Sequence, residues 1–376
     1  MRDLRVAMIG AGFMGKAHSL AYAMAPVIYK LPVRVHRQVV VDVTDALAAA
    51  AAETLNFTEA ATRWQEVVAR ADIDIVDIAT PNDSHEEIAV AAARNGKHVI
   101  CEKPLALDAG GAERMWRAAE QAGVVNMSAY NYRKTPAIAY ARTLIESGEI
   151  GTPYMLRFNY LQDWGLSGAP YVWRYNRKLA GSGAIGDIGS HAIDSAEYML
   201  GEIRRVTGVV RTLTPTRPQP SGVGEPGVVD VDDVAVFIAE FASGAIGTFT
   251  ASRHSLSRKN QLGFELDASA GALKFNWEAR DELHVSLSTD PAAVSGFRKV
   301  NLGPAHPTPW WPIAGMGTGY LETSTNQVHD FLTAIVNGGR VRPDVRDGTH
   351  VARVVDAVLA SSESGAWVNV ESVQGG

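Results

Sequence analysis

The chain has 376 residues, of which 46% are hydrophobic and 20% charged, and its formal net charge is −6. This length and composition are typical of a globular protein with two domains. The negative charge disfavours nucleic acid as the main partner, because phosphate binding requires a basic surface. The N-terminal residues lead directly into a strand pattern, so we expect no signal peptide, and no apolar run reaches the roughly 18 residues that span a bilayer. A single cysteine, Cys101, excludes an internal disulfide and suits a reducing compartment. We therefore expect a soluble, cytoplasmic protein with no membrane partner.

A glycine-rich motif, Gly10-Ala11-Gly12-Phe13-Met14-Gly15, follows an apolar strand over 4–9 and precedes an Ala-rich helical stretch. In the order strand, turn, helix, Gly-x-Gly-x-x-Gly predicts a dinucleotide site. The first Gly permits the turn, the second lets the backbone approach a pyrophosphate, and the third lets helix and strand pack closely. The helix N-terminus adds unpaired N–H groups. We expect the cofactor to be bound by Gly10, Gly12, Phe13, Met14 and Gly15.

The second strand, over 39–41, ends at Asp42, which is the candidate acid for the ribose hydroxyls. Asp42 comes later after Gly15 than the usual spacing of about 20 residues, which an extended loop over 31–37 would explain. In the alternative, Asp42 is a turn residue and Asp45 is the acid. Because an acid without a neighbouring Arg would repel a 2′-phosphate, the sequence favours NAD over NADP.

Helices and strands continue to alternate through the first third of the chain. We expect helices over 46–55, 84–95 and 108–122, and strands over 73–79, 97–101 and 124–129. This alternation predicts a doubly wound parallel sheet, hence an α/β Rossmann domain over residues 1–130. Glu102-Lys103-Pro104 follows the strand over 97–101, at the sheet edge where such folds bind ligands. An isolated Glu-Lys-Pro would otherwise be read as a solvated strand end. Cys101, within the apolar strand, is expected to be a small core residue.

Strand patterns dominate residues 131–376. Strands are expected over 154–160, 206–213, 234–241, 246–251, 263–268, 272–277, 283–287 and 366–370, and helices over 137–147, 187–200, 323–337 and 348–362. Short turns between successive strands predict an α+β C-terminal domain with a large, mainly antiparallel open sheet. The Pro/Gly-rich segment 215–227 is expected to be a surface loop, and 303–312 either a flap over a site or a packed loop.

Asp187 and His191 are four residues apart, which places both side chains on one helix face. Oxidation of a carbinol to a ketone needs a base, and an imidazole can accept a proton near neutral pH. Lys103 can stabilise a developing alkoxide, while Asp187 can orient the imidazole or bind a neighbouring hydroxyl. Taken alone, His191 would more often pack or cap a helix. A metal site would need further ligands such as His254, His284 or His306, but no second close ligand pair appears, so we predict no metal.

The chain resembles the Gfo/Idh/MocA oxidoreductases, a family that includes glucose–fructose oxidoreductases, inositol dehydrogenases and related sugar dehydrogenases. The resemblance rests on the motifs at 10–18, 80–85, 102–104, 131–133 and 186–194, in this order and spacing. It implies that Lys103, Asp187 and His191 form a catalytic set and that NAD(P) is bound. It also implies that the cofactor is lined by Thr80, Asn82, His85, Glu102 and Asn131. Family members assemble through the open face of the C-terminal sheet, so a dimer or tetramer is expected, and a cis Lys103–Pro104 bond is suggested.

Within the family, the segments 12–22, 160–164, 179–184, 303–307 and 311–313 are similar to those of an anhydrosugar dehydrogenase. This implies NAD-dependent oxidation of a cyclic sugar or 1,6-anhydro sugar at the C3 hydroxyl, giving a 3-keto sugar. It makes Tyr132, Gln162, Trp164 and Arg174 candidates for binding sugar hydroxyls or the nicotinamide side. The loop 165–172 does not match. The alternatives are an inositol dehydrogenase, a glycoside 3-dehydrogenase, an NAD-using glycoside hydrolase with transient oxidation, or a catalytically silent binding protein.

Overall fold

The computed structural model describes residues 1–308, 313 and 315–373 of the chain. The chain forms two compact units, the first built from Met1–Asn131 and Tyr320–Thr349 and the second from Tyr132–Gly319 and His350–Gly376. The sequence predicts a single domain boundary, after residue 130, with residues 131–376 in the second domain. The structure differs because the segment 320–349 returns to the first unit, where its helix completes the core.

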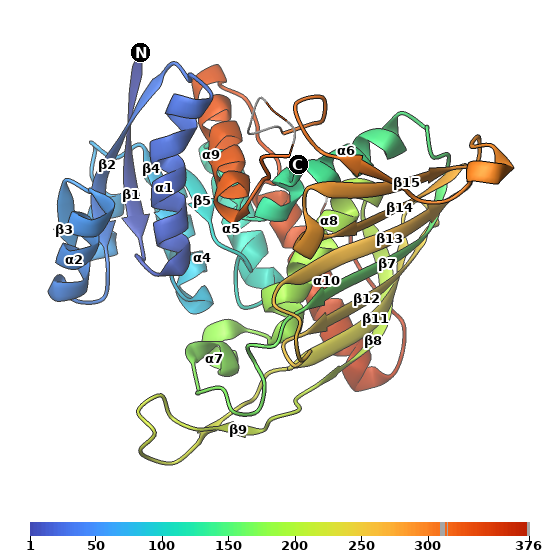
Figure 1. Cartoon of the computed structure of the whole chain (residues 1–376). Coiled ribbons are helices and arrows are strands. Elements are labelled where there is room, and N and C mark those ends of the chain that lie inside the picture. Colours follow the sequence, from blue (N-terminus) through green and yellow to red (C-terminus); the bar gives the residue numbers. More distant parts are fainter. Residues whose placement is uncertain (309–312, 314, 374–376) are drawn as a thin grey trace. The chain divides into compact units, whose positions relative to one another are not determined.

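The first unit contains a parallel sheet in the order β3-β2-β1-β4-β5-β6 (Figure 1). Its strands are β1 (Arg2–Ile9), β2 (Val33–Val41), β3 (Glu59–Ala61), β4 (Ile75–Ile78), β5 (His98–Cys101) and β6 (Asn126–Ser128). The strand order reverses between β1 and β4, and ligands bind beyond the carboxyl ends of the strands at such a switch point. The predicted Rossmann fold is confirmed, although the short β3 was not predicted.

Helices of the first unit connect these strands. They are α1 (Phe13–Ile28), α2 (Asp45–Leu55), α3 (Trp64–Val68), α4 (His85–Arg94), α5 (Ala109–Ala122) and α9 (Tyr320–Asn337), with a 3-10 turn, η1 (Asn82–Ser84), before α4. Two of them begin at side-chain caps: the Thr44 hydroxyl accepts from the N–H of Leu47 at 3.2 Å, and the Asp108 carboxylate accepts from the N–H of Gly111 at 2.8 Å. Such caps satisfy backbone donors that the first turn leaves unpaired.

The helix α9 belongs to the first unit although it lies far from the other elements in sequence. Its side chains Phe331 and Leu332 have no exposed surface and join a core cluster with Leu4 of β1 and Tyr22 of α1. Burial of an apolar side chain of this size contributes roughly 1.5–3 kcal/mol. The sequence predicts α9 as an amphipathic helix but does not show which sheet it covers.

The strand β2 begins at Val33 and pairs with β1 along its length. The extended loop predicted over 31–37 is therefore wrong, because its residues from Val33 onward are strand. The long interval between Gly15 and Asp42 has a different cause: α1 continues through Ile28 and is followed by a nine-residue strand. The first half of β2 is only partly buried, so its polar residues conceal the strand pattern.

The second unit is built on a mixed sheet in the order β16-β15-β14-β13-β7-β12-β11-β8-β17. Its strands are β7 (Pro153–Leu161), β8 (Ile203–Arg211), β11 (Val234–Phe241), β12 (Ile246–Ser252), β13 (Gln261–Ala268), β14 (Gly271–Asn276), β15 (Glu282–Leu287), β16 (Arg298–Asn301) and β17 (Val368–Asn369). The pairing is antiparallel except between β7 and β12, which run parallel. The predicted α+β domain with a large, mainly antiparallel sheet is confirmed, although β16 was not predicted.

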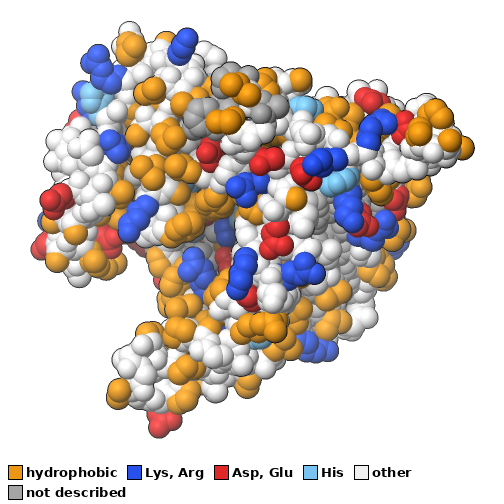
Figure 2. All heavy atoms as spheres, viewed as in Figure 1, with side chains coloured by type: hydrophobic (Ala, Val, Ile, Leu, Met, Phe, Trp, Pro, Cys, Tyr) orange, Lys and Arg blue, Asp and Glu red, His pale blue; other side chains and the backbone are white. Residues whose placement is uncertain are grey.

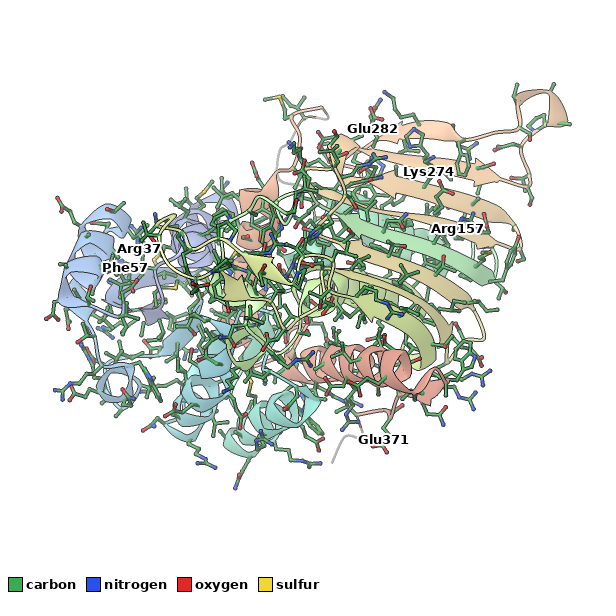
Figure 3. All side chains as sticks on the ribbon, turned by 90° about the horizontal axis from the view of Figure 1, so that it is seen from below. Arg37, Phe57, Arg157, Lys274, Glu282 and Glu371 are labelled. Carbon is green, nitrogen blue, oxygen red and sulfur yellow. The ribbon has the colours of Figure 1, made fainter. Side chains whose placement is uncertain are left out.

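One face of this sheet is covered by helices and the other is open (Figure 1). The helical elements are η2 (Asn131–Lys134), α6 (Pro136–Glu146), η3 (Trp173–Tyr175), α7 (Arg177–Ala180), η4 (Ile185–Gly189), α8 (Ser190–Leu200), η5 (Trp277–Ala279), η6 (Ala292–Val294) and α10 (Val345–Ser364). Because alternate residues of a strand face opposite sides, Phe158 and Phe249 are buried while Ile238 and Ile246 are exposed. Figure 3 labels Arg157, Lys274 and Glu282 on the strands β7, β14 and β15.

A long connection between β8 and β11 extends away from the large sheet and carries the short pair β9 (Thr216–Arg217) and β10 (Gly227–Val228). Val223 and Val228 on it are about two-thirds exposed or more, and the part of this connection seen in Figure 2 carries mostly uncharged side chains. Among the described residues, no helix combines the length and apolar character needed to cross a bilayer. Part of the 303–312 loop, residues 309–312, lies outside the described residues.

Candidate active site

The glycine-rich turn connects β1 to α1. A Cβ atom added at Gly10 would lie 2.7 Å from the carbonyl oxygen of Ala79, and one added at Gly15 would lie 2.1 Å from that of Gly10. Both positions therefore need glycine for close packing. At Gly12, in contrast, no heavy atom of the described chain lies within 4 Å of the added Cβ. Since α1 begins at Phe13, its unpaired first-turn N–H groups adjoin this open space. The backbone here has the form that accepts a pyrophosphate.

Asp42 follows the last residue of β2, and its carboxylate contacts the glycine-rich turn. Oδ2 accepts from the N–H of Ala11 at 3.2 Å, and Oδ1 accepts from the N–H of Val43 at 2.7 Å. Each carboxylate oxygen retains capacity for another hydrogen bond, as ribose hydroxyls require. Asp45, the alternative acid, is the exposed first residue of α2. The geometry therefore favours Asp42 over Asp45 as the acid that binds the ribose hydroxyls.

The helix α9 reaches the predicted cofactor residues of the first unit. Phe13 is 73% exposed, and its ring centroid lies 5.9 Å from that of Tyr320. The Tyr320 hydroxyl lies 3.3 Å from the sulfur of Met14. Asn131 is buried and donates through Nδ2 to the Thr323 hydroxyl at 3.0 Å. Tyr320 and Thr323 were not predicted, because nothing in the local sequence shows that α9 packs here.

The turn after β4 contains the predicted cofactor residues Thr80, Asn82 and His85. Asn82 is buried, and the hydroxyl of Ser84 donates to that of Thr80 at 2.7 Å. His85 is fully buried, with Nδ1 3.0 Å from the carbonyl oxygen of Pro104 and Nε2 2.9 Å from that of Thr80. Burial lowers the pKa of this imidazole, while the two carbonyl contacts oppose the shift. These contacts favour a supporting role for His85, which ties two turns of the sheet edge together.

Glu102, Lys103 and Pro104 directly follow β5. The Lys103–Pro104 peptide bond is cis, as the family resemblance suggests. Glu102 is 5% exposed, and its Oε2 accepts from the backbone N–H of Lys103 at 3.1 Å. The carboxylate thus fixes the backbone that carries the half-buried Lys103 side chain. The preceding Cys101 is a core residue, as expected: burial raises the pKa of its thiol well above the usual value.

A buried charged triad, consisting of Asp77, His18 and Glu102, supports this turn. The imidazole Nδ1 of His18 lies 2.9 Å from Oδ1 of Asp77, and Nε2 lies 3.2 Å from Oε1 of Glu102. Burial alone would lower the pKa of His18, but the two carboxylates outweigh this effect and raise it to about 10. Both ring nitrogens face acceptors, so the imidazolium form satisfies both contacts. The triad links the start of α1 to the Glu-Lys-Pro turn.

In the second unit, Asp187 and His191 lie at the beginning of the α8 region. The sequence predicts one α-helix over 187–200, whereas Asp187 lies in a π-helical turn, η4, and α8 starts just before His191. Single π turns inside helices are frequent at functional sites. The entry to the turn is held by Asp232, whose carboxylate accepts from the N–H groups of Gly183 at 2.7 Å and Ile185 at 2.8 Å. Burial raises the pKa of Asp232, and these hydrogen bonds lower it in part. Asp232 was not predicted.

His191 packs against two buried tyrosines. Its ring is perpendicular to that of Tyr132 at a centroid distance of 4.8 Å, and lies 6.0 Å from that of Tyr160. The two tyrosine hydroxyls are 2.8 Å apart, and Asn260 donates through Nδ2 to the Tyr132 hydroxyl at 2.9 Å. Burial raises the pKa of Tyr132. Tyr132 is only 1% exposed, so the geometry favours support of His191 over direct contact with a sugar.

A polar chain of Trp164, Gln162, Asn260, Tyr160 and Tyr132 continues from this cluster. The indole Nε1 of Trp164 donates to Oε1 of Gln162 at 2.7 Å. Gln162 Nε2 donates to Oδ1 of Asn260 at 2.8 Å, and the Tyr160 hydroxyl donates to the same oxygen at 2.8 Å. The structure therefore joins three residues predicted for the substrate through Asn260, which the sequence analysis missed.

The carboxylate of Asp187 faces two guanidinium groups. Its Oδ2 lies 3.3 Å from Nη2 of Arg253, which is fully buried, and its Oδ1 lies 4.0 Å from Nε of Arg174. The guanidinium of Arg174 also lies 4.4 Å above the ring of Trp173. Arg174, a predicted substrate residue, is thus near Asp187, whereas Lys103 belongs to the first unit. No group of three or more His, Cys, Asp or Glu side chains within the described part of the chain is arranged to hold a metal ion.

Comparison with known proteins shows where this chain belongs. Residues 4–130 match the model of the oxidoreductase family with an NAD-binding Rossmann fold, and residues 138–274 match the GFO/IDH/MocA C-terminal domain. Levoglucosan dehydrogenase of Pseudarthrobacter phenanthrenivorans is 44% identical over 99% of this chain and 100% of its own. The chain belongs to the Gfo/Idh/MocA oxidoreductase family. It is an NAD-dependent sugar dehydrogenase.

A more distant relative and a solved structure also match over nearly the whole chain. Inositol 2-dehydrogenase of Rhizobium meliloti is 28% identical over 95% of this chain and 96% of its own. The solved structure of levoglucosan dehydrogenase in complex with NADH and levoglucosan has 44% identity and a TM-score of 0.96, and it covers 99% of this chain and 100% of its own. NAD is the cofactor of the chain, and the open position at Gly12 fits its pyrophosphate.

Proposed function

We propose that this dehydrogenase oxidises the C3 hydroxyl of levoglucosan or of a similar cyclic sugar to a 3-keto sugar, with Lys103, Asp187 and His191 as its catalytic residues. The observation that carries the substrate assignment is the 44% identity to levoglucosan dehydrogenase over 99% of the chain. The residue roles are supported by the position of Lys103 at the end of β5 and by the packing of His191 beside the polar chain.

The chain's own groups account for the proton chemistry. Bound NAD supplies the hydride acceptor. His191 accepts the hydroxyl proton as a general base, a role that suits an imidazole near neutral pH. The ammonium of Lys103 donates a hydrogen bond to the reacting oxygen and stabilises its developing negative charge. The carboxylate of Asp187 accepts from a neighbouring sugar hydroxyl. Asp42, beside the glycine-rich turn, accepts from the ribose hydroxyls.

The polar chain supplies the sugar-binding groups of the second unit. Trp164 is 37% exposed, so its indole face can pack against the apolar side of a sugar ring. Gln162 donates through Nε2 to Asn260 at 2.8 Å and to the Tyr160 hydroxyl at 3.4 Å, and its Oε1 accepts from Trp164, which leaves a lone pair of Oε1 for a sugar hydroxyl. Arg174, 41% exposed at the side chain, can donate to a further hydroxyl beside Asp187.

The experiment is an NADH-release screen of the purified protein against levoglucosan, inositols, free hexoses and O- or C-glycosides. We expect the highest kcat/KM with levoglucosan, and NMR of the product should show a ketone at C3. A higher kcat/KM with an inositol would refute the substrate assignment and favour the activity named for the Rhizobium meliloti relative. Release of an aglycone without net NADH would favour the hydrolase alternative instead.

We further propose that the chain assembles into a dimer or tetramer through the open face of the large sheet. Val236 of β11 is paired with Val209 of β8, both are exposed there, and Ile238 and Ile246 are exposed on the same face. Apolar patches of this kind mark protein–protein interfaces. Light scattering after size-exclusion chromatography measures the assembly. Ile238→Glu should yield monomers, because it buries a charge in the interface, whereas Val223→Glu, on the β8–β11 connection, should not. An unchanged mass for Ile238→Glu would refute the assignment of this face.

A further inference from the structure

Arg253 immediately follows β12, and none of its side chain is exposed. Its Nη2 lies 3.3 Å from Oδ2 of Asp187, and its Nη1 donates to the carbonyl oxygen of Arg174 at 3.4 Å. The guanidinium carbon lies 5.0 Å from the ring centroid of Trp164 and 5.9 Å from that of Tyr175. One buried cation therefore contacts Asp187, Trp164 and the backbone of Arg174, the three places where a sugar would be recognised.

The charge of Arg253 determines how Asp187 is held. An ion buried without an opposite charge is strongly destabilising, so a buried guanidinium needs a carboxylate at close range. Asp187 provides one, yet its own side chain is still 19% exposed. The contact with Arg253 is made by Oδ2, whereas Oδ1 lies 4.0 Å from the half-exposed side chain of Arg174. The carboxylate is therefore fixed from its buried side.

Arg217 offers a comparison within the same unit. It is also fully buried, and its guanidinium lies 4.0 Å from the ring of Tyr175. Its carboxylate partner is Asp233, at 3.3 Å, and it donates to the carbonyl oxygen of Gly165 at 2.6 Å. Both arginines thus pack on Tyr175 and stabilise the loops around it. They differ in their carboxylate partner, because Arg217 lies against Asp233 and Arg253 lies against Asp187.

We propose that Arg253 is a positioning residue for sugar oxidation, whose guanidinium holds the carboxylate of Asp187 and the indole of Trp164 in fixed relative positions. A ring hydroxyl at Asp187 and the sugar face at Trp164 are then recognised together. This inference rests on the proposed function, because it requires Asp187 to contact the substrate. Arg253 itself is buried and acts through these two side chains.

A double-mutant cycle tests the proposal. kcat and KM for levoglucosan are measured at saturating NAD for Arg253→Gln, Asp187→Asn and the double variant. Arg253→Gln should lower kcat/KM about 10- to 100-fold alone, but by only about 3- to 5-fold when Asp187→Asn is already present, because Trp164 is then the one remaining group of the two that it positions. Arg253→Lys, which keeps the charge, should recover part of the loss. Equal losses from Arg253→Gln in both backgrounds would overturn the proposal.

Arg217→Gln is the matched control. It removes an equally buried guanidinium from the same Tyr175, so it should lower the Tm to a similar extent. Its effect on kcat/KM should be the same with and without Asp187→Asn, as expected for a residue that only stabilises the fold. Near- and far-UV circular dichroism shows that each variant is folded. Coupling of Arg217 to Asp187 as strong as that of Arg253 would also overturn the proposal.

A stability measurement keeps the test informative if the Arg253 variants do not fold. Asp187→Asn removes the carboxylate that lies 3.3 Å from the Arg253 guanidinium. The buried carboxylate of Asp232, which also interacts electrostatically with Arg253, remains, so the Tm should fall by about 3 °C or more. An unchanged Tm would show that Arg253 does not depend on Asp187 and would overturn the inference. Failure of the proposed function has a different signature: Asp187→Asn would then retain wild-type kcat/KM, whatever its Tm.

Discussion

The substitution His18→Gln tests the buried triad beneath the Glu-Lys-Pro turn. The carboxylates of Asp77 and Glu102 overcome the effect of burial and raise the pKa of His18 from 6.5 to about 10. A pKa raised on folding stabilises the protein when the group is protonated. At about 1.4 kcal/mol per pKa unit, the difference between the two pKa values adds roughly 5 kcal/mol to the free energy of unfolding. This contribution is fully present below pH 6.5 and is lost as the pH rises through 10.

The pH dependence of unfolding provides the assay. From about pH 7.5 to about pH 9.5, the contribution of His18 should fall from about 3 to about 1 kcal/mol. The wild type should therefore lose about 2 kcal/mol more stability over this range than His18→Gln in urea unfolding. His36→Gln is the control, because His36 forms an ion pair with Asp3 in the same unit but on its surface. It should leave the wild-type pH dependence unchanged.

NMR of the ring nitrogens measures the protonation state of His18 directly. In protein labelled with ¹⁵N at its ten histidines, His18→Gln identifies the His18 signals by their loss. Both ring nitrogens should show imidazolium shifts at about pH 8, well above the reference pKa of about 6.5. A neutral imidazole at that pH, or a stability difference between wild type and His18→Gln that does not change with pH, would refute the reasoning.

Four further substitutions address the chemistry. Lys103→Ala and His191→Ala should each lower kcat by at least about 10²-fold, the usual scale for a positioned proton-transfer group, and near wild-type turnover in both would contradict their roles. The protein should bind NAD with a lower Kd than NADP, and Asp42→Ala should reduce that preference; a Kd for NADP at or below that for NAD in the wild type would overturn the role of Asp42. Asn260→Ala should raise the KM for the sugar about 5- to 10-fold with a smaller effect on kcat, since it removes the amide oxygen that accepts from both Gln162 and Tyr160. An unchanged KM would show that the polar chain does not organise the substrate side.

The sequence predicts those structural features that are determined by residues close to one another in the chain. The strand, turn and helix around Gly10 and Gly15 are local, and so is the short link from β5 to Lys103, which explains why the Rossmann fold and its sheet edge are predictable. The spacing of Asp187 and His191 is also local. The π-helical turn is not predictable from it, because that turn is held by Asp232 from a distant segment.

Contacts between distant segments explain what the sequence analysis missed. Nothing near Tyr320 shows that α9 covers the first sheet, because an amphipathic helix specifies a buried face and not its partner. Asn260 and Arg253 stand in stretches without a motif, so their roles follow only from the packing that brings them to Gln162 and Asp187. The same is true of His18 and Asp77, which lie 59 residues apart.

The two units hold their chemical residues by the same physical means. In the first, the imidazolium of His18 fixes Glu102, which in turn binds the backbone N–H of Lys103. In the second, the guanidinium of Arg253 fixes the carboxylate of Asp187. In both cases a buried cation lies against a carboxylate, and removing the cation takes away a charge partner in surroundings of low dielectric constant. Such rigid support is what a catalytic group needs, because misplacement by about 1 Å can cost as much as 10²-fold in rate. Variants of His18 and Arg253 should therefore impair catalysis beyond what their loss of stability explains.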